Sequence, residues 1–284
     1  MKALGTLLFL PLLLSGCGGS SSTGTSDSAS PGQAADPAPI TAGAWYQPVP
    51  LVTWQWQLQG TVDTGYDVEI YDIDLFDSDV SLIQSIQASG RKVICYFSAG
   101  SYENWRDDAG DFEAADLGNT LDGWAGERWL DIRNPNVRGI MEARLDLAVS
   151  KGCDGVEPDN MDGYTNDPGF GFTAADQLTY NRWLANQTHQ RTLAVGLKND
   201  LNQIDSLVSY FDFAVNEQCF QYDECDRLQP FIDASKPVLN AEYLDAYAND
   251  ASQRAALCTD SINRQFSTLV LPLALDDSFR YSCN

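Results

Sequence analysis

Residues 134–160 read NPNVRGIMEARLDLAVSKGCDGVEPDN, and this stretch decides the fold. Asn134 followed by Pro135 is typical of a helix start, because Asn caps free backbone amides and proline suits the first helical position. Gly152 ends the segment, since glycine readily adopts the left-handed conformation that closes a helix. The short segment 155–160 that follows, Gly-Val-Glu-Pro-Asp-Asn, predicts a strand that ends in Asp159 and Asn160. The stretch is therefore a helix that leads into a strand, as in an α/β fold.

The same alternation of short apolar strands and longer helices begins near residue 51. One helix is predicted from Ser78-Asp79 to Gly90, and another opens with a variant capping box formed by Thr173 and Asp176. The predicted strands are 54–58, 68–74, 92–98, 129–132, 155–160, 193–199, 211–217, 238–243 and 269–275.

Strands joined by crossover helices pair in parallel, and at this length they predict a single-domain α/β fold, the (β/α)8 TIM barrel. The prediction has one strand too many, and no helix fits between Leu58 and Val68, so one strand is expected to be an extra or irregular one. An open doubly wound sheet would need a nucleotide-binding loop. Its nearest match, Gly169-Phe-Gly-Phe-Thr-Ala174, follows a loop and not a strand, and is interpreted as a loop and helix start.

The chain is strongly acidic. Its 284 residues include 40 Asp and Glu against 17 Lys and Arg, which gives a formal net charge of −23. This charge disfavours nucleic acid and anionic polysaccharides as partners, because phosphate and other anions need clustered cations. The single histidine, His189, also disfavours a histidine-based triad or a multi-histidine zinc site.

The first 40 residues predict export. Residues 1–16 are a predicted lipoprotein signal peptide, with a short positive start and an apolar run of suitable length. The motif Leu14-Ser-Gly-Cys17 at its end resembles a bacterial lipobox, which is cleaved before the cysteine. Cys17 is therefore the predicted lipidation site, the alternative being an ordinary signal peptide. Residues 17–40 predict a flexible tether, and residues 41–284 the (β/α)8 domain. We expect a monomeric, membrane-anchored lipoprotein in the outer membrane or periplasm, or on the cell surface.

Six cysteines follow Cys17, an even number in a compartment that permits disulfides. Cys219 and Cys225 predict a small loop disulfide, and Cys258 and Cys283 a bridge from the last helix to the C-terminus. Cys95 and Cys153 are either a third bridge or buried free thiols. No Cys-x-x-Cys pair and no Asp-x-Asp-x-Asp-Gly loop occurs, so neither a metal site nor a cofactor is predicted.

Polar and acidic residues follow nearly every predicted strand, where the active sites of barrels lie. Strand side chains alternate with period two, so Glu157 and Asp159 face the same way, as do Asp72 and Asp74. Each could instead be a helix cap or a buried hydrogen-bond partner. The strand-end residues are Asp72, Asp74, Ser98, Ser101, Asp131, Arg133, Glu157, Asp159, Asn160, Asp162, Lys198, Asn199, Asp200, Asn216, Glu217, Asn240, Glu242, Tyr243, Asp276 and Asp277.

Paired carboxylates without a usable histidine are typical of a glycosidase active site. One carboxyl group protonates the leaving oxygen, and the other acts as nucleophile or base. Aromatic residues near the strand ends are candidates for stacking on sugar rings, or for ordinary core packing. They are Trp105, Trp124, Tyr164, Tyr222 and Tyr243.

Several motifs of the chain resemble glycoside hydrolase family 114, in the right order over roughly residues 45–284. They are WQWQLQG (54–60), YDID (71–74), VICYFSAG (93–100), WLDI (129–132), GVEPDN (155–160), GLKN (196–199), Asn216-Glu217 and NAEY (240–243). This family comprises barrel-fold endo-α-1,4-polygalactosaminidases and the hydrolase domain of the Pel polysaccharide protein.

The resemblance implies Asp159 as nucleophile and Glu217 as general acid/base, whereas the residues alone leave Glu157 competing with Asp159. Candidates for substrate binding, on position only, are Asp72, Asp74, Glu157, Asn160, Lys198, Asn240, Glu242 and Tyr243. The resemblance also implies endo-cleavage of α-1,4 linkages in partly deacetylated, cationic galactosamine polysaccharide, and we expect retention of configuration. The alternatives are a glycosidase for another α-linked glycan and a non-catalytic sugar-binding lipoprotein.

Overall fold

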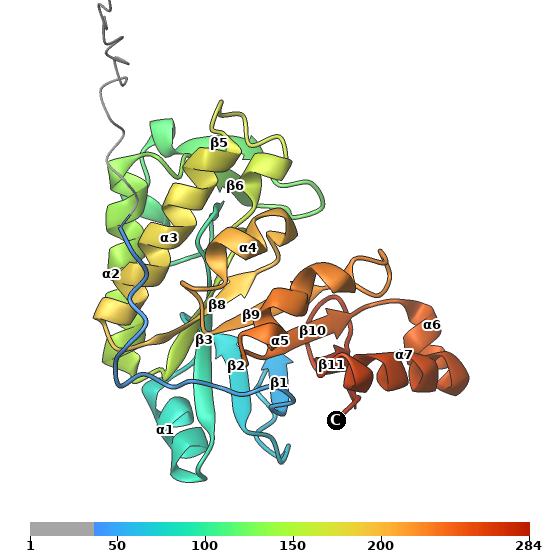
Figure 1. Cartoon of the computed structure of the whole chain (residues 1–284). Helices are drawn as coiled ribbons and strands as arrows, with labels where there is room; N and C mark the ends of the chain where they lie inside the picture. Colours follow the sequence, from blue (N-terminus) through green and yellow to red (C-terminus); the bar gives the residue numbers. More distant parts are fainter. Residues whose placement is uncertain (1–36) are drawn as a thin grey trace, which may run out of the picture. The chain divides into compact units, whose positions relative to one another are not determined.

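The computed structural model describes residues 37–284, which fold around one curled sheet (Figure 1). The predicted signal peptide, Cys17 and most of the tether lie outside the described residues. Eight strands pair in parallel and a short antiparallel strand follows them at one edge. In order across the sheet they are β1 (Trp54–Gln57), β2 (Ile70–Asp74), β3 (Lys92–Ser98), β7 (Gly155–Asp159), β8 (Ala194–Lys198), β9 (Phe213–Glu217), β10 (Val238–Glu242), β11 (Ser267–Val270) and β12 (Tyr281–Ser282).

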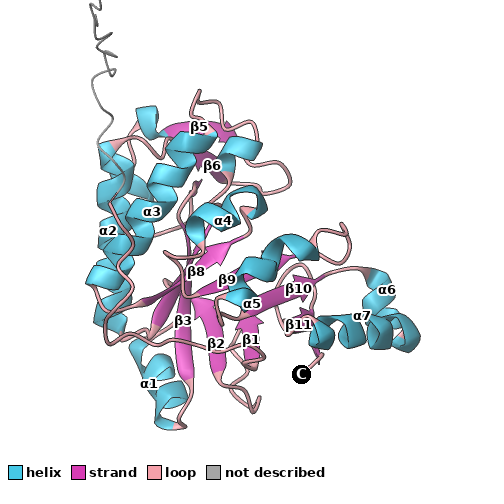
Figure 2. Ribbon diagram, viewed as in Figure 1, coloured by secondary structure: helices cyan, strands magenta, loops and turns pink. Residues whose placement is uncertain are grey.

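Helices connect most of these strands and cover the outer face of the sheet (Figure 2). The α-helices are α1 (Val80–Ala88), α2 (Pro135–Lys151), α3 (Ala174–Gln190), α4 (Ile204–Leu207), α5 (Gln229–Asp233), α6 (Asp245–Asn249) and α7 (Ala251–Asn263). Single 3-10 turns are η1 (Ala109–Asp111), η2 (Ala114–Asp116), η3 (Gly163–Thr165), η4 (Leu201–Gln203) and η5 (Cys225–Leu228).

The helix ends expected from the sequence are confirmed. The Asn134 side chain accepts a hydrogen bond from the backbone amide of Asn136, and Gly152 closes α2 with φ 85°. Thr173 and Asp176 form both halves of the capping box at the start of α3. These signals were visible in the sequence because each depends on neighbouring residues alone.

The predicted strand 129–132 does not belong to the parallel sheet. Its first residues form β6 (Glu127–Leu130), which lies in a separate antiparallel sheet between β4 (Ser101–Glu103) and β5 (Leu117–Thr120). This small sheet is inserted between β3 and α2. Tryptophan and leucine in a short run predict a buried strand but do not say which partner it pairs with. The extra strand expected from the sequence is therefore β6.

The ladder of the main sheet is open between β12 and β1 within residues 37–284, so the closed barrel is present only in part. The two ends nevertheless meet. The Trp54 indole donates to the Ser267 carbonyl (2.9 Å), and Arg280 donates to the Trp54 carbonyl (2.7 Å). Because strands at opposite ends of the ladder are in contact, the sheet curls into a TIM-barrel-like shape. The structure has no helix between β1 and β2, as expected.

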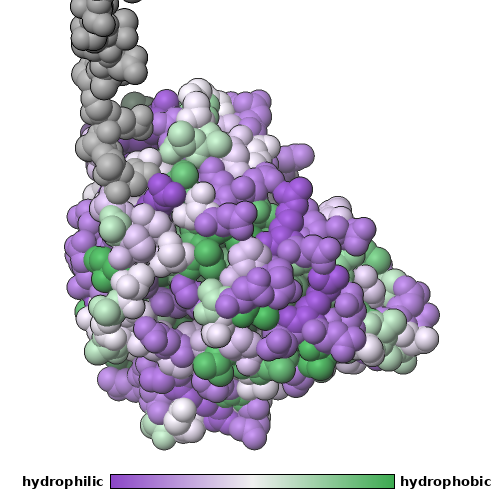
Figure 3. All heavy atoms as spheres, viewed as in Figure 1, coloured by the Kyte–Doolittle hydropathy of each residue, from purple (hydrophilic) through white to green (hydrophobic). Residues whose placement is uncertain are grey.

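Alternation along the strands divides the core in two. One face of each strand carries residues such as Trp54, Ile70 and Phe213, which pack together inside the curl. The opposite face packs against the helices, as Val93 and Val156 do. We call these the inner and outer faces. Polar side chains cover most of the molecular face in Figure 3, with apolar ones in small patches, which fits a core buried between these layers.

Within residues 37–284, the six cysteines form three disulfides, two of them between elements that lie apart in the chain. Cys95 of β3 is bonded to Cys153 before β7, so the third bridge is present in place of free thiols. The loop after β9 is closed by Cys219–Cys225, and α7 is tied to the C-terminus by Cys258–Cys283, as expected. Such links stabilise a fold mainly by restricting the unfolded chain.

The first described residues already contact the domain. The Tyr210 hydroxyl donates to the Pro37 carbonyl (2.8 Å), and the Asn186 side chain bonds the Ala38 carbonyl (3.0 Å) and the Ile40 amide (2.9 Å). Contacts with the domain thus include residues before 41. Between residues 37 and 284, no helix has the length and apolarity needed to cross a membrane.

Candidate active site

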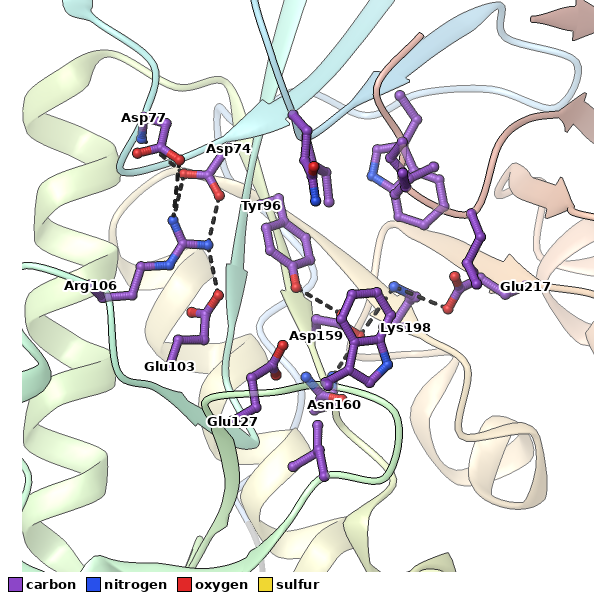
Figure 4. Close-up of a pocket in the computed structure, with 18 of the residues that line it drawn as sticks. Asp74, Asp77, Tyr96, Glu103, Arg106, Glu127, Asp159, Asn160, Lys198 and Glu217 are labelled. Carbon is purple, nitrogen blue, oxygen red and sulfur yellow. Dashed lines mark hydrogen bonds and ion pairs between the residues drawn. The ribbon is translucent and has the colours of Figure 1, made fainter. Parts of the chain in front are cut away.

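Three neighbouring strands end in ionisable side chains. Asp159 ends β7, Lys198 ends β8 and Glu217 ends β9, and these strands are adjacent in the parallel sheet. Parallel strands bring their carboxyl ends to one rim, and the three residues share the inner face. The rim is therefore a carboxylate, a cation and a carboxylate side by side (Figure 4).

Lys198 lies at the centre of this group. Its Nζ is 3.1 Å from Asp159 Oδ1, 3.4 Å from Glu217 Oε2 and 3.2 Å from Glu157 Oε1. The side chain is buried, which by itself lowers the pKa of Lys198, but the charges of Asp159, Glu217 and Glu157 raise it well above its ordinary value. The ammonium group is therefore charged at neutral pH.

Hydrogen bonds hold each carboxylate of the rim in place. Asp159 accepts from the Tyr96 hydroxyl (3.0 Å) and from the backbone amide of Asn160 (2.6 Å). Glu217 accepts from the Tyr243 hydroxyl (2.6 Å) and from the side-chain amide of Asn199 (3.3 Å). Burial, together with the charge of Glu217, raises the pKa of Tyr243 well above its ordinary value, so this hydroxyl remains a donor.

The chain turns sharply after each of these strands. Asn160, Asn199 and Gln218 directly follow β7, β8 and β9, and all three have positive φ, at 60°, 49° and 63°. Asparagine tolerates this left-handed conformation, whereas it is strained for glutamine. The turns make Asp159, Lys198 and Glu217 the last strand residues, with their side chains at the rim.

Asp159 and Glu157 share one face but differ in depth. Asp159 lines the cavity at the rim, whereas Glu157 is fully buried one layer below, close to Asp72. Burial raises the pKa of Glu157 to about 7 against the lowering effect of Lys198, and burial together with Glu157 raises the pKa of Asp72 well above its ordinary value. Strand periodicity does not distinguish Asp159 from Glu157, but their depth below the rim does, because Asp159 lines the cavity and Glu157 does not.

The remaining substrate-binding candidates divide by position. Asp74, Asn160 and Lys198 line the cavity, and Asp74 there accepts two hydrogen bonds from Arg106 (2.9 and 2.7 Å). Asn240 and Glu242 lie on the outer face of β10, because its inner residues are Leu239 and Ala241.

Buried Glu242 accepts from the Phe220 amide (2.9 Å), so its contacts lie away from the cavity. Tyr243 reaches the site indirectly, through its bond to Glu217.

The cavity above the rim has a volume of about 410 Å³. Trp105 and Trp124 border it and are 52% and 50% exposed, so their rings are open to a ligand. Trp56 forms part of its floor, with Lys198 Nζ 4.8 Å from the ring centre. A second hollow adjoins it and shares Trp124, Asn160 and Asp162. The combined shape is an extended groove with exposed aromatic walls, which suits a chain of sugars.

One wall of the cavity was not predicted. Glu103, Arg106 and Glu127 line it and come from the inserted segment that contains β4 and β6. Arg106 pairs with Asp74 and with Glu103 (2.7 Å each), so it fastens the insertion to β2. These residues could not be predicted from the sequence, because none directly follows a strand of the parallel sheet. The only local signal was the paired tryptophans, Trp105 and Trp124.

Other strand-end residues have structural partners. Asp131 pairs with Arg133 (2.8 Å) after β6, and Asp277 accepts from Gln55 (3.0 Å). His189 stacks on Trp45 and bonds Asp212 (2.9 Å), so it is a buried structural residue. Among residues 37–284, no group of three or more His, Cys, Asp or Glu side chains is arranged to hold a metal ion.

Two carboxylates on either side of a lysine at the strand ends of a TIM-barrel-like sheet, beside exposed tryptophans, form the arrangement expected of a glycoside hydrolase. The chain matches the sequence profile of glycoside-hydrolase family GH114 over residues 34–284, and it belongs to this family. The family resemblance stated from the motifs is thereby confirmed.

Solved structures agree with this assignment. Ega3 of Aspergillus fumigatus, in complex with galactosamine, is 46% identical with a TM-score of 0.80, over 85% of this chain and 99% of that one. The glycoside hydrolase domain of PelA from Pseudomonas aeruginosa is 13% identical with a TM-score of 0.63, over 80% and 96%, and shows the shared fold. No curated protein matched the chain.

Proposed function

We propose that this protein is an endo-acting glycoside hydrolase that cleaves α-1,4 linkages in partly deacetylated galactosamine polysaccharide. The observation that carries the proposal is the placement of Asp159 and Glu217 on either side of Lys198 at the floor of a groove. Asp159 is the proposed nucleophile and Glu217 the proposed general acid/base. The galactosamine bound by Ega3, at 46% identity, supports an amino sugar as ligand.

The charges around Lys198 suit a two-step reaction. In the first step Asp159 would attack the anomeric carbon and lose its negative charge on forming the ester, while Glu217 gives its proton to the leaving oxygen and becomes negative. Lys198 contacts both carboxylates, so its cation would balance Asp159 before this step and Glu217 after it. In the second step Glu217 takes a proton from water, and the original distribution returns.

The geometry favours retention of configuration. Asp159 Oδ1 and Glu217 Oε2 both lie within 3.4 Å of one nitrogen atom. These two oxygens are therefore at most about 6.5 Å apart, at the lower limit of the roughly 6.5–9.5 Å that inverting glycosidases keep between their carboxyl groups. A separation this short leaves little room for the water that inversion requires.

The acidity of the chain supports a cationic substrate. A deacetylated galactosamine polymer carries ammonium groups, and the formal net charge of −23 would attract it. The lipobox-like Cys17 and the tether after it support a role outside the cytoplasm, with the enzyme anchored to a membrane by lipid. We propose that the enzyme is monomeric and has this location. We also propose that its curled sheet is a variant of the closed (β/α)8 barrel.

The test is reducing-end release from a partly deacetylated α-1,4-galactosamine polymer. The domain 37–284 would be compared with its Asp159→Asn and Glu217→Gln variants and with Asp205→Asn, an exposed carboxylate. Activity that both site variants lose and the control keeps supports the proposal. A folded wild-type protein that binds the polymer without cleaving it would overturn the proposal and favour a sugar-binding role.

A further inference from the structure

Glu127 lines the cavity, but the proposed mechanism does not use it. It begins β6 on the inserted sheet, and only 8% of the residue is exposed. Its Oε2 accepts a hydrogen bond from Ser101 (2.8 Å), while no hydrogen bond or ion pair is made by Oε1 within residues 37–284. Figure 4 shows its carboxylate in the cavity wall beside Asn160. Glu127 is thus a nearly buried carboxylate with one oxygen free for a ligand.

Most other carboxylates in this cavity have cations, Asp162 being the exception among the described residues. Asp74 and Glu103 pair with Arg106, and Asp159 and Glu217 pair with Lys198. Glu127 forms no ion pair with any described residue. A buried carboxylate without a counter-charge is costly, and the cost falls if a ligand brings the missing cation.

A rigid network holds Glu127 close to the reacting centre. Ser101 joins Glu127 to Ser98, with 2.6 Å between the two hydroxyl oxygens. The Asn160 side-chain amide donates to Ser98 (2.9 Å), and its backbone amide donates to Asp159. A sugar placed for attack by Asp159 would therefore lie beside a carboxylate that is already oriented.

We infer that Glu127 binds the 2-ammonium group of a galactosamine residue in this cavity and selects free-amine sugars over N-acetylated ones. This inference rests on the proposed function for its substrate. An ammonium donates hydrogen bonds and neutralises Glu127, whereas an acetamide adds bulk and leaves the carboxylate without a counter-charge. Glu127, which recognises the amine of the substrate, therefore lies on the inserted sheet. The proposed catalytic pair, Asp159 and Glu217, lies on the parallel sheet.

Sugar binding tests the inference without requiring cleavage. Dissociation constants for galactosamine and N-acetylgalactosamine would be measured by NMR titration at pH 7.5. We expect the wild-type protein to prefer galactosamine, and Glu127→Gln to weaken galactosamine binding about 10- to 100-fold, the usual effect of losing a charged hydrogen bond. Binding of N-acetylgalactosamine should change little, since it does not use the charge.

Three variants separate the effect of charge from that of folding. Glu127→Asp keeps the charge and should retain part of the preference. Asp205→Asn removes an exposed charge and should leave the preference for galactosamine intact. Asp162→Asn removes the charge of the other unpaired carboxylate in the cavity. Equal weakening of both sugars by Glu127→Gln, or loss of the preference only in Asp162→Asn, would overturn the inference.

The two proposals can fail separately. If Glu127 sets the sugar preference but the wild-type protein cleaves no polymer, the proposed hydrolase activity is wrong and the binding role stands. If the polymer is cleaved while Glu127→Gln leaves the ratio of the two dissociation constants unchanged, the inference about Glu127 is wrong.

Discussion

The hydroxyl of Tyr243, which follows β10, donates a 2.6 Å hydrogen bond to Glu217 Oε1 at the end of β9. It fixes the orientation of the proposed acid/base from the neighbouring strand. We predict that Tyr243→Phe keeps the fold and lowers kcat about 10-fold or more, because a poorly oriented acid transfers its proton less efficiently. Steady-state kinetics on the polymer measure this effect.

Tyr222→Phe, at an exposed site, is the matched control and should behave like the wild-type enzyme. An unchanged kcat in Tyr243→Phe would mean that Glu217 does not need this bond. A rise in KM alone would point to a binding role for the hydroxyl.

Lys198 is expected to be indispensable. Replacing it with methionine keeps much of its volume but leaves Glu157, Asp159 and Glu217 facing one another without a cation. We predict at least a 100-fold loss of kcat, the scale associated with removing a preorganised charge from an active site. Circular dichroism would establish that the variant is folded, and a kcat within a few-fold of the wild-type value contradicts the charge-balancing role.

Buried Asp200 should make stability depend on pH. Burial raises the pKa of Asp200 to about 8, although hydrogen bonds from Tyr164 and Asn181 lower it. The native state thus holds a proton that the unfolded chain releases near its ordinary pKa, so this contribution is complete in acid and is lost as pH rises towards 8.

Asp200→Asn cannot ionise and can still bond both neighbours. The wild-type Tm should therefore fall by several degrees more than that of Asp200→Asn between pH 5 and pH 8. Exposed Asp205→Asn should follow the wild-type curve. Parallel curves for Asp200→Asn and the wild-type protein would contradict a protonated Asp200.

Glu127 should give galactosamine binding its own pH dependence. Burial raises the pKa of Glu127 to about 7, and of the groups around it Ser101 and Arg106 lower this pKa while Glu103 and Asp159 raise it. Wild-type affinity should therefore increase as pH rises from 5.5 to 7.5, because the carboxylate gains its charge.

The control is the affinity of Glu127→Gln for galactosamine at each pH. Because both proteins bind the same sugar, titration of its amine cancels from the ratio of wild-type to variant affinity. That ratio should grow with pH and level off above about 8. A ratio that is constant over this range would mean that the ionisation of Glu127 does not control binding.

Much of the architecture was readable from short stretches of sequence. The caps of α2 and α3 lie within a few residues of the helix ends they determine, and apolar runs marked the parallel strands. Asp159 and Glu217 could be nominated for the same reason, since each directly ends a strand and matches a family motif.

The sequence by itself thus determined the elements, the alternation of strands and helices, and the acidic strand ends, because these depend on neighbours in the chain. Only the tertiary structure decided that β6 pairs within an inserted sheet, that Asn240 and Glu242 face outwards, and that Glu127 joins the cavity. Which face of a strand points inwards depends on register and curl across the whole sheet. Packing of the whole domain determines which distant segments pair. The periodicity along one strand therefore does not indicate its partner.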